Sequence, residues 1–222
     1  MGRRFKHLCR TGAALGIVVA AVLAVMPGTA SAAPHVNLQK MPAGLHPIFA
    51  SVGPSTNAPI GWIDFCIEYK PECKTRPSIP RDVVLSSKAW SDMIKVNLWV
   101  NQTIKPMTDM DHWGVVERWN YPSDGYGDCE DYVLLKRRML MRAGWPREAL
   151  LITVVRDKHD EGHAVLTVKT DRGEFILDNQ TDRVLPWIRT GYKFVKRQSQ
   201  SNPNTWVALG APQEATPVVS AR

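Results

Sequence analysis

The spacing of apolar residues changes near residue 149, and this change constrains the fold more than any other feature of the sequence. Upstream, residues 81–104 carry apolar side chains at helical spacing: Trp90, Met93, Ile94, Val100 and Ile104. Downstream, the stretches LLITVV, HAVLTVKT, EFILD and YKFVKRQ are typical of β-strands. The sequence therefore predicts an α+β fold, with helices first and an antiparallel sheet second.

Two further helices are expected before the sheet. Residues 109–119 predict a short helix, which the turn-forming stretch YPSDGYG ends. The next helix is predicted to begin at Asp128 and to end at Gly144, with Pro146 preventing its continuation. Acidic residues at its start and Lys136 to Arg138 toward its end suit the helix dipole.

The first 32 residues have the pattern of a secretory signal peptide. Basic residues precede an uncharged run at residues 12–26, and Ala30-Ser31-Ala32 then forms a small-x-small cleavage site. This run is shorter than the ~20 residues that a membrane helix needs. For the exported chain we expect an extended arm at residues 33–60, one domain at 61–210 and a flexible tail at 211–222.

The net charge argues against a nucleic-acid partner. The whole chain has a formal net charge of +7, but the leader contains four basic residues and no acidic one, so its removal leaves +3. No run of five basic residues remains to form a phosphate-binding patch.

Three cysteines remain after the leader, and disulfides persist in exported proteins. Cys66 and Cys73 lie seven residues apart in FCIEYKPEC, which we interpret as a polar, proline-containing loop. A bridge across it is expected to contribute ~2 to 3 kcal/mol, and two unpaired thiols are the alternative. Cys129 is then the unpaired cysteine.

The stretch GYGDCEDY places Cys129 in the first turn of a predicted helix. Free backbone N–H groups there favour a thiolate and can stabilise an oxyanion. Gly125 and Gly127 permit a sharp turn and the close approach of a substrate chain. A structural cysteine, paired or buried, is the competing interpretation.

A nucleophilic cysteine needs a base, and His163 fits that role best among the histidines beyond the leader. It opens the predicted strand HAVLTV, whereas His159 lies in the charged loop RDKHDEG. Asp178 ends the next strand and is placed to orient His163. A hairpin turn around Thr170-Asp171 puts these two residues opposite each other, and a turn centred on Arg172 pairs His163 with residue 181 instead.

The ordered set of these motifs resembles the bacterial transglutaminase-like cysteine proteinases, whose best-known members are periplasmic proteases of the LapG type. The matching stretches are GWIDFC, PEC, GDCEDY, GHAVLTV, FILDNQTD, VLPW and NPNTW. The resemblance implies a papain-like or transglutaminase-like fold. It also implies that Cys129 is the nucleophile, that His163 is the general base and acid, and that Asp178 orients His163.

Acidic residues surround Cys129 and should raise the pKa of its thiol unless something offsets them. Acidic residues in a first helical turn are stabilised by the dipole, and a hard cation such as calcium is the other explanation. The resemblance implies calcium ligands at Asp128 and Glu130. Asp131 is a third candidate ligand, with capping of the helix as its alternative role.

Aromatic residues near the motif have two possible roles. Trp113, Trp119, Tyr121 and Tyr126 either line a substrate groove or pack the helices on the sheet, and Trp187 and Trp206 are expected in the core.

The resulting hypothesis is a monomeric, calcium-dependent cysteine endopeptidase of the periplasm. The resemblance implies a large surface adhesin as substrate and an inner-membrane receptor protein as regulator. A transglutaminase or amidase with the same triad is the first alternative. The second is a calcium-stabilised binding module without catalysis.

Overall fold

The computed structural model describes residues 39–41, 48–74 and 79–210. The expected signal peptide at 1–32, most of the expected arm before residue 48, and the tail at 211–222 lie outside these residues. The described elements belong to one compact unit of the chain, residues 37–222. Within them, no helix has the length and apolar character needed to cross a membrane.

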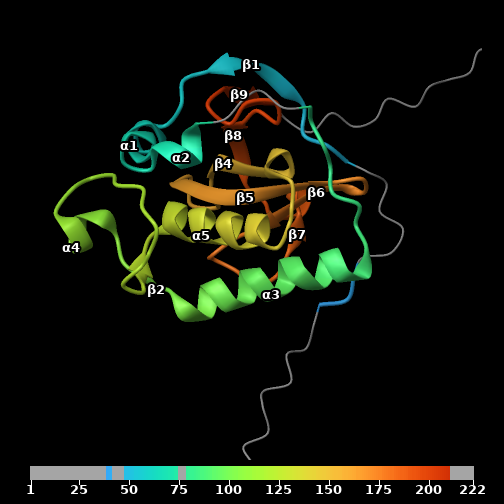
Figure 1. Cartoon of the computed structure of the whole chain (residues 1–222), viewed down its shortest axis with the longest axis horizontal. Helices are drawn as coiled ribbons and strands as arrows, with labels where there is room; N and C mark the ends of the chain where they lie inside the picture. Colours follow the sequence, from blue (N-terminus) through green and yellow to red (C-terminus); the bar gives the residue numbers. More distant parts are fainter. Residues whose placement is uncertain (1–38, 42–47, 75–78, 211–222) are drawn as a thin grey trace, which may run out of the picture. The chain divides into compact units, whose positions relative to one another are not determined.

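One antiparallel sheet of seven strands organises this unit (Figure 1). In order across the sheet, the strands are β1 (Val52–Thr56), β9 (Trp206–Leu209), β8 (Lys193–Gln198), β4 (Leu150–Arg156), β5 (Gly162–Thr170), β6 (Gly173–Leu177) and β7 (Leu185–Pro186). The predicted strands correspond to β4, β5, β6 and β8. Strand β1 lies in the segment expected to be an extended arm, and it pairs with β9 at the edge of the sheet.

Five α-helices are described, and they precede β4 in the chain. They are α1 (Ile60–Glu68), α2 (Lys70–Cys73), α3 (Ser87–Thr103), α4 (Asp109–Trp113) and α5 (Cys129–Arg142). Helix α3 begins later than predicted because the Ser86 hydroxyl caps it, accepting a hydrogen bond from Ala89 N. Helix α4 ends before Trp119 because Gly114 adopts a left-handed conformation, φ +70°.

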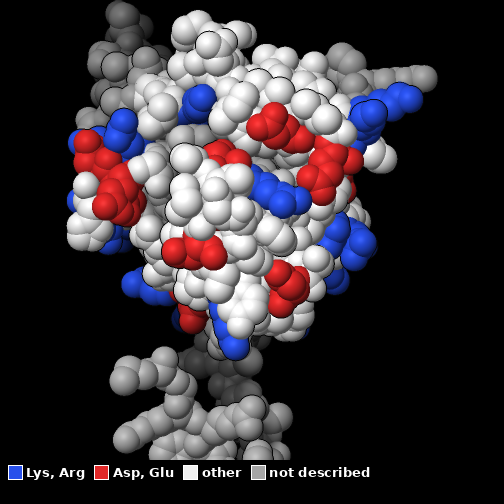
Figure 2. Space-filling model, turned by 90° about the vertical axis from the view of Figure 1, so that its left-hand side faces the viewer, with Lys and Arg blue, Asp and Glu red and all other residues white. Residues whose placement is uncertain are grey.

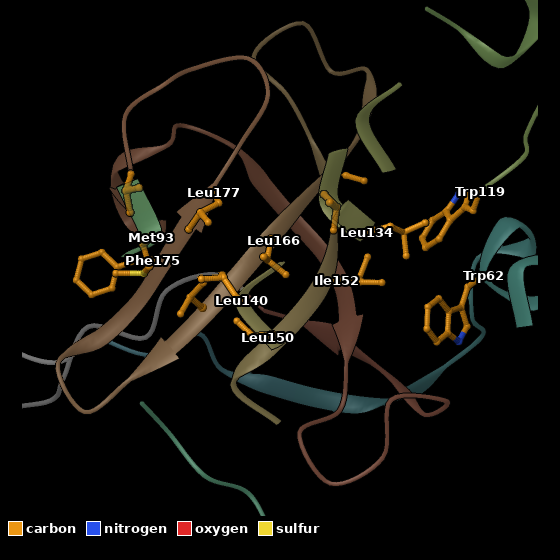
Figure 3. Close-up of a cluster of buried hydrophobic side chains, with 14 of the residues drawn as sticks. Trp62, Met93, Trp119, Leu134, Leu140, Leu150, Ile152, Leu166, Phe175 and Leu177 are labelled. Carbon is orange, nitrogen blue, oxygen red and sulfur yellow. The ribbon is translucent and has the colours of Figure 1, made fainter. Parts of the chain in front are cut away.

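Helix α5 packs on one face of the sheet and α3 packs beside α5 (Figure 1). The core between them contains Leu134 and Leu140 of α5, Met93 of α3, and side chains of alternate positions on the strands, such as Ile152 and Leu166 (Figure 3). Burial of each such side chain contributes about 1.5 to 3 kcal/mol. The α+β prediction is therefore confirmed, with helices covering one face of an antiparallel sheet.

The other face of the central strands is also buried. There Val165 of β5 and Ile176 of β6 pack with Trp187 and Leu209. The expected core positions of Trp187 and Trp206 are confirmed, since their exposed fractions are 3% and 1%. The centre of the sheet is thus held from both sides, which makes β5 and β6 a rigid base for side chains at their ends.

The prediction of a loop between Cys66 and Cys73 is wrong, although the predicted disulfide is present. Helices α1 and α2 occupy this segment and meet at Tyr69, whose φ of −105° and ψ of 52° break the helix. Trp62 and Phe65 lie one turn apart on α1, and both are buried in the main core. This burial of an apolar face outweighs the polar composition that suggested a loop.

Candidate active site

Cys129 is the first residue of α5, one residue after the predicted start, and it lies in the first turn as predicted. Asp128 precedes the helix in an extended conformation and makes no side-chain cap. Gly125 has a φ of +89°, which disfavours other residues. A Cβ on Gly127 would lie 2.7 Å from the Asp131 side chain, so only glycine fits there.

A short parallel pair of strands fixes the approach of the chain to α5. Strands β2 (Lys105–Pro106) and β3 (Tyr126–Gly127) pair side by side. Met107 N donates to Gly127 O at 3.0 Å, which holds the segment leading into α4 against the residues that precede Cys129. This pairing brings the α4 segment next to the start of α5.

The Cys129 thiol is partly buried and makes two hydrogen bonds. It donates to Glu130 Oε2 at 3.0 Å and accepts from Ala164 N at 3.4 Å. Burial and the Glu130 carboxylate raise the pKa of this thiol well above its ordinary value, against a lowering by the Ala164 amide. Without an added positive charge, this environment favours the neutral thiol.

His163 lies next to Ala164 at the start of β5, and its Nε2 is 2.8 Å from Asp178 Oδ1. Both side chains are almost fully buried. The structure therefore brings together the start of α5, the start of β5 and the end of β6, which carry the three residues expected to form the triad.

The predicted registers of the β5–β6 hairpin are both wrong. Thr170 pairs with Gly173 across a two-residue turn, and Leu166 pairs with Leu177. If this register is continued by one residue, Asp178 lies opposite Val165. His163, two residues before Val165, is then the diagonal neighbour of Asp178. Diagonal neighbours in a sheet remain within reach of long side chains, which explains how the contact forms.

Two further residues fix the Asp178 carboxylate. Tyr192 Oη donates to Asp178 Oδ2 at 2.5 Å, and Gln180 N donates to Asp178 Oδ1 at 3.0 Å. Burial raises the pKa of Asp178, but His163 and these hydrogen bonds outweigh it and hold the pKa below its ordinary value. Asp178 is thus a carboxylate at neutral pH. Tyr192 and Gln180 were not predicted as site residues from the sequence, because a tyrosine or glutamine near a strand carries no specific signal.

Three carboxylates from two segments converge beside Cys129. Ligand oxygens of Asp109, Asp128 and Glu130 lie within 4.8 Å of one another. Burial is the largest cause that raises the pKa of Asp128 to about 6 and that of Glu130 to about 9. Asp128 Oδ1 is buried and has no hydrogen-bond partner among the described residues. Such an oxygen cluster suits a hard divalent cation.

Asp131 lies outside this cluster. Its carboxylate accepts hydrogen bonds from Asn120 N at 2.8 Å and from Asn120 Nδ2 at 3.1 Å, and these bonds tie α5 to the preceding segment. The third member of the cluster is Asp109 of α4. Asp109 was not predicted as a ligand from the sequence, because the β2–β3 pairing that brings α4 to this position has no local signal.

The aromatic residues near the site divide between core and surface. Trp119 and Tyr121 are buried in the main core, at exposed fractions of 3% and 7%. Trp113 is exposed and stacks on His112, with ring centroids 3.9 Å apart. Tyr126 is half-buried in β3. Only Trp113 and Tyr126 therefore remain available to line a groove.

Comparisons with known proteins place these features in a family context. The model of the family described as bacterial transglutaminase-like cysteine proteinase BTLCP matches residues 52–214. A search of curated proteins found no significant match.

Three similar solved structures are of Legionella pneumophila LapG. The calcium-bound form is 25% identical, with a TM-score of 0.46, and the match covers 57% of this chain and 74% of that one. The EGTA-treated form is 28% identical, with a TM-score of 0.45, and the match covers 54% of this chain and 69% of that one. A third structure is 27% identical, with a TM-score of 0.44, and the match covers 53% of this chain and 67% of that one.

Proposed function

The chain belongs to the bacterial transglutaminase-like cysteine proteinases and is a cysteine peptidase. From this premise we propose that Cys129, His163 and Asp178 form the catalytic triad of a calcium-dependent endopeptidase. The observation that carries the proposal is the hydrogen bond from Ala164 N to Cys129 Sγ, because Ala164 directly follows the buried, Asp178-bound His163. The three side chains thus come from elements that are in contact.

The proposed reaction begins with a proton transfer. Because His163 Nε2 faces Asp178, His163 Nδ1 is the nitrogen that takes the proton from Cys129 Sγ. The thiolate attacks the peptide carbonyl carbon, and backbone N–H groups at the start of α5 stabilise the oxyanion. His163 then protonates the leaving amine, and water hydrolyses the thioester and regenerates the thiol.

Asp109, Asp128 and Glu130 are the residues that would hold calcium. A bound calcium ion would supply positive charge beside the thiol and would offset the charge of the three carboxyl groups. Glu130, which raises the pKa of the Cys129 thiol, would be among the groups whose charge is offset. Calcium would thus favour the reactive thiolate.

The proposed location is the periplasm, with residues 1–32 as the signal that directs export. The proposed substrate is a segment of a large surface adhesin, and the proposed regulator is an inner-membrane receptor protein. Support for these assignments comes from the resemblance to the LapG-type proteases and from the leader pattern in the sequence. We further propose that the protein acts as a monomer.

Proteolysis of an unfolded protein tests this function. Purified protein is incubated with reduced, alkylated casein in calcium or in EGTA, and new chain termini are identified by mass spectrometry. We expect new termini in calcium with the wild type and none with Cys129→Ala. Cross-linked chains without new termini would favour acyl transfer to an amine, the transglutaminase alternative. No reaction with any acceptor would contradict the triad.

A further inference from the structure

A cavity of about 450 Å³ lies beside the Asp178–Tyr192 hydrogen bond. Its walls come from the loop that follows β6, from the turn before β8, and from the loop between β4 and β5. Asp178 and Tyr192 form the wall nearest to the proposed triad. The cavity therefore adjoins the residue proposed to orient His163.

Three exposed cations line this cavity: Lys158, Arg183 and Arg189. None of their charged groups makes an ion pair or a side-chain hydrogen bond with any described residue. Two cations nearby, Arg156 and Lys193, do form ion pairs, and both pair with Asp160. The cavity we call the basic pocket thus presents three positive charges that the fold itself does not neutralise.

Asp178 is the acidic residue among the lining side chains, and it is not available to pair with these cations. Its oxygens are occupied by His163, Gln180 N and Tyr192. An imidazolium at His163 in the reaction would cancel its charge. The lining side chains of the basic pocket thus carry three positive charges and one negative charge, and Asp157 is next to the lining, where it binds Gln180 Nε2. Such a local excess of positive charge attracts anions.

Two features of the backbone shape the basic pocket around Lys158 and Arg189. Gly191 has a φ of +77°, and a Cβ on it would lie 3.4 Å from the Lys158 Cε, so the Lys158 stem lies against this glycine. Thr190 Oγ1 is buried and donates to Trp187 O, which fixes the turn that carries Arg189. The planar guanidinium groups of Arg183 and Arg189 can each bind a carboxylate through two parallel N–H···O bonds.

We propose that the basic pocket binds an acidic segment of the protein substrate, with Asp or Glu side chains near the scissile bond. This inference rests on the proposed function, since a peptidase binds a polypeptide across its catalytic cysteine. One other face of the molecule differs from this arrangement. On the face formed by α1, α2 and α4, acidic and basic side chains are interspersed (Figure 2). An acidic segment would therefore be attracted to the basic pocket more than to that face.

Peptide binding to Cys129→Ala tests the inference without requiring catalysis. The probes are the peptides (Glu-Ala)5 and (Gln-Ala)5 with the same dye, measured by fluorescence anisotropy at low salt. We expect the acidic peptide to bind about tenfold more tightly, as three weakly screened charge pairs allow. In 1 M salt the preference should disappear, because the Debye length is then about 3 Å.

Charge-reversal variants test whether the basic pocket causes the preference for the acidic peptide. In the Cys129→Ala background, Arg183→Glu with Arg189→Glu should abolish this preference. Lys95→Glu, on the exposed side of α3, should leave the preference unchanged. Arg183→Gln with Arg189→Gln should weaken it to an intermediate value, and thermal melting of each variant checks the fold. Equal binding of the two peptides, or a preference that survives the double reversal in a folded variant, would overturn the inference.

The outcome separates this inference from the proposed function. An acidic preference without casein cleavage by the wild type would contradict the peptidase mechanism and leave the basic pocket in place. Calcium-dependent cleavage without an acidic preference would contradict the basic pocket alone.

Discussion

The Cys129 thiol donates a hydrogen bond to the Glu130 carboxyl group, with 3.0 Å between Sγ and Oε2. Glu130 also belongs to the acidic cluster with Asp109 and Asp128. One carboxyl group thus belongs to the proposed calcium site and contacts the proposed nucleophile. Occupancy of the proposed calcium site and reactivity of the thiol would therefore be linked through Glu130.

Calcium binding is predicted to release protons at pH 7. The pKa of Glu130 is raised to about 9 in the calcium-free protein, so its carboxyl group carries a proton at neutral pH that a metal ion must displace. Calcium affinity should then fall as the pH falls. Titration calorimetry in two buffers with different ionisation enthalpies measures the released protons. Equal heats in both buffers would contradict this prediction, and Glu130→Gln should reduce the release.

Asp109→Asn is predicted to weaken calcium binding by at least about tenfold, because the site loses one of its charged ligands. The asparagine oxygen retains an acceptor for Arg118 N, so the fold of the α4 segment should persist. Asp111→Asn is the matched control, since Asp111 lies on the same helix but is exposed and outside the acidic cluster. Competition with a fluorescent calcium indicator compares the two. Similar affinities for both variants would exclude Asp109 as a ligand.

Tyr192→Phe is predicted to lower kcat by about tenfold with little change in KM, because Asp178 loses a charge-assisted hydrogen bond. The loss also raises the pKa of Asp178, so the acidic limb of the pH–rate profile should move to higher pH. Asp178→Asn should cost more, about 10²- to 10⁴-fold in kcat, since the orientation of His163 is lost. Unchanged kcat values in both variants would remove Asp178 from the mechanism.

Lys136→Met is predicted to stabilise the protein at pH 7. Lys136 is buried on α5, and its Nζ has no hydrogen-bond partner among the described residues. Burial lowers its pKa from 10.5 to about 7, so between these pH values the unfolded chain binds a proton that the folded chain does not. Stability therefore falls as pH drops from 10.5 to 7.

Replacing this buried amine should add about 1 to 4 kcal/mol to the free energy of unfolding at pH 7, and the gain should shrink toward pH 10.5. Urea unfolding at pH 7 and pH 9.5 measures both values. Lys95→Met, at an exposed position of α3, is the control and should change little. A Lys136→Met variant that is less stable than the wild type at pH 7 would contradict the prediction that the buried Lys136 amine destabilises the fold.

Local signals in the sequence were sufficient for the elements that carry the proposed triad. Periodicity and capping residues identified α5 and placed Cys129 at its start, and short runs of β-forming residues identified β5 and β6. These signals depend on neighbours in the chain, so a single sequence reveals them. The disulfide was also predictable, because Cys66 and Cys73 are close in sequence.

Features that depend on tertiary contacts were not predictable. Asp109 joins Asp128 only because β2 and β3 pair, and no local pattern signals that pairing. The diagonal contact of His163 with Asp178 depends on a two-residue turn, which the turn sequence did not specify. Helix α1 forms in a polar-looking segment because Trp62 and Phe65 find a core to pack against.

The reactivity of Cys129 toward iodoacetamide, measured against pH in calcium and mapped by mass spectrometry, tests the central claim most directly. We predict that Cys129 alone is labelled, with an apparent pKa below the ~8.5 of a free thiol, and that this pKa rises in His163→Ala and in EGTA. A Cys129 that reacts in calcium no faster than a model thiol, and that responds to neither His163→Ala nor EGTA, would contradict the proposed nucleophile.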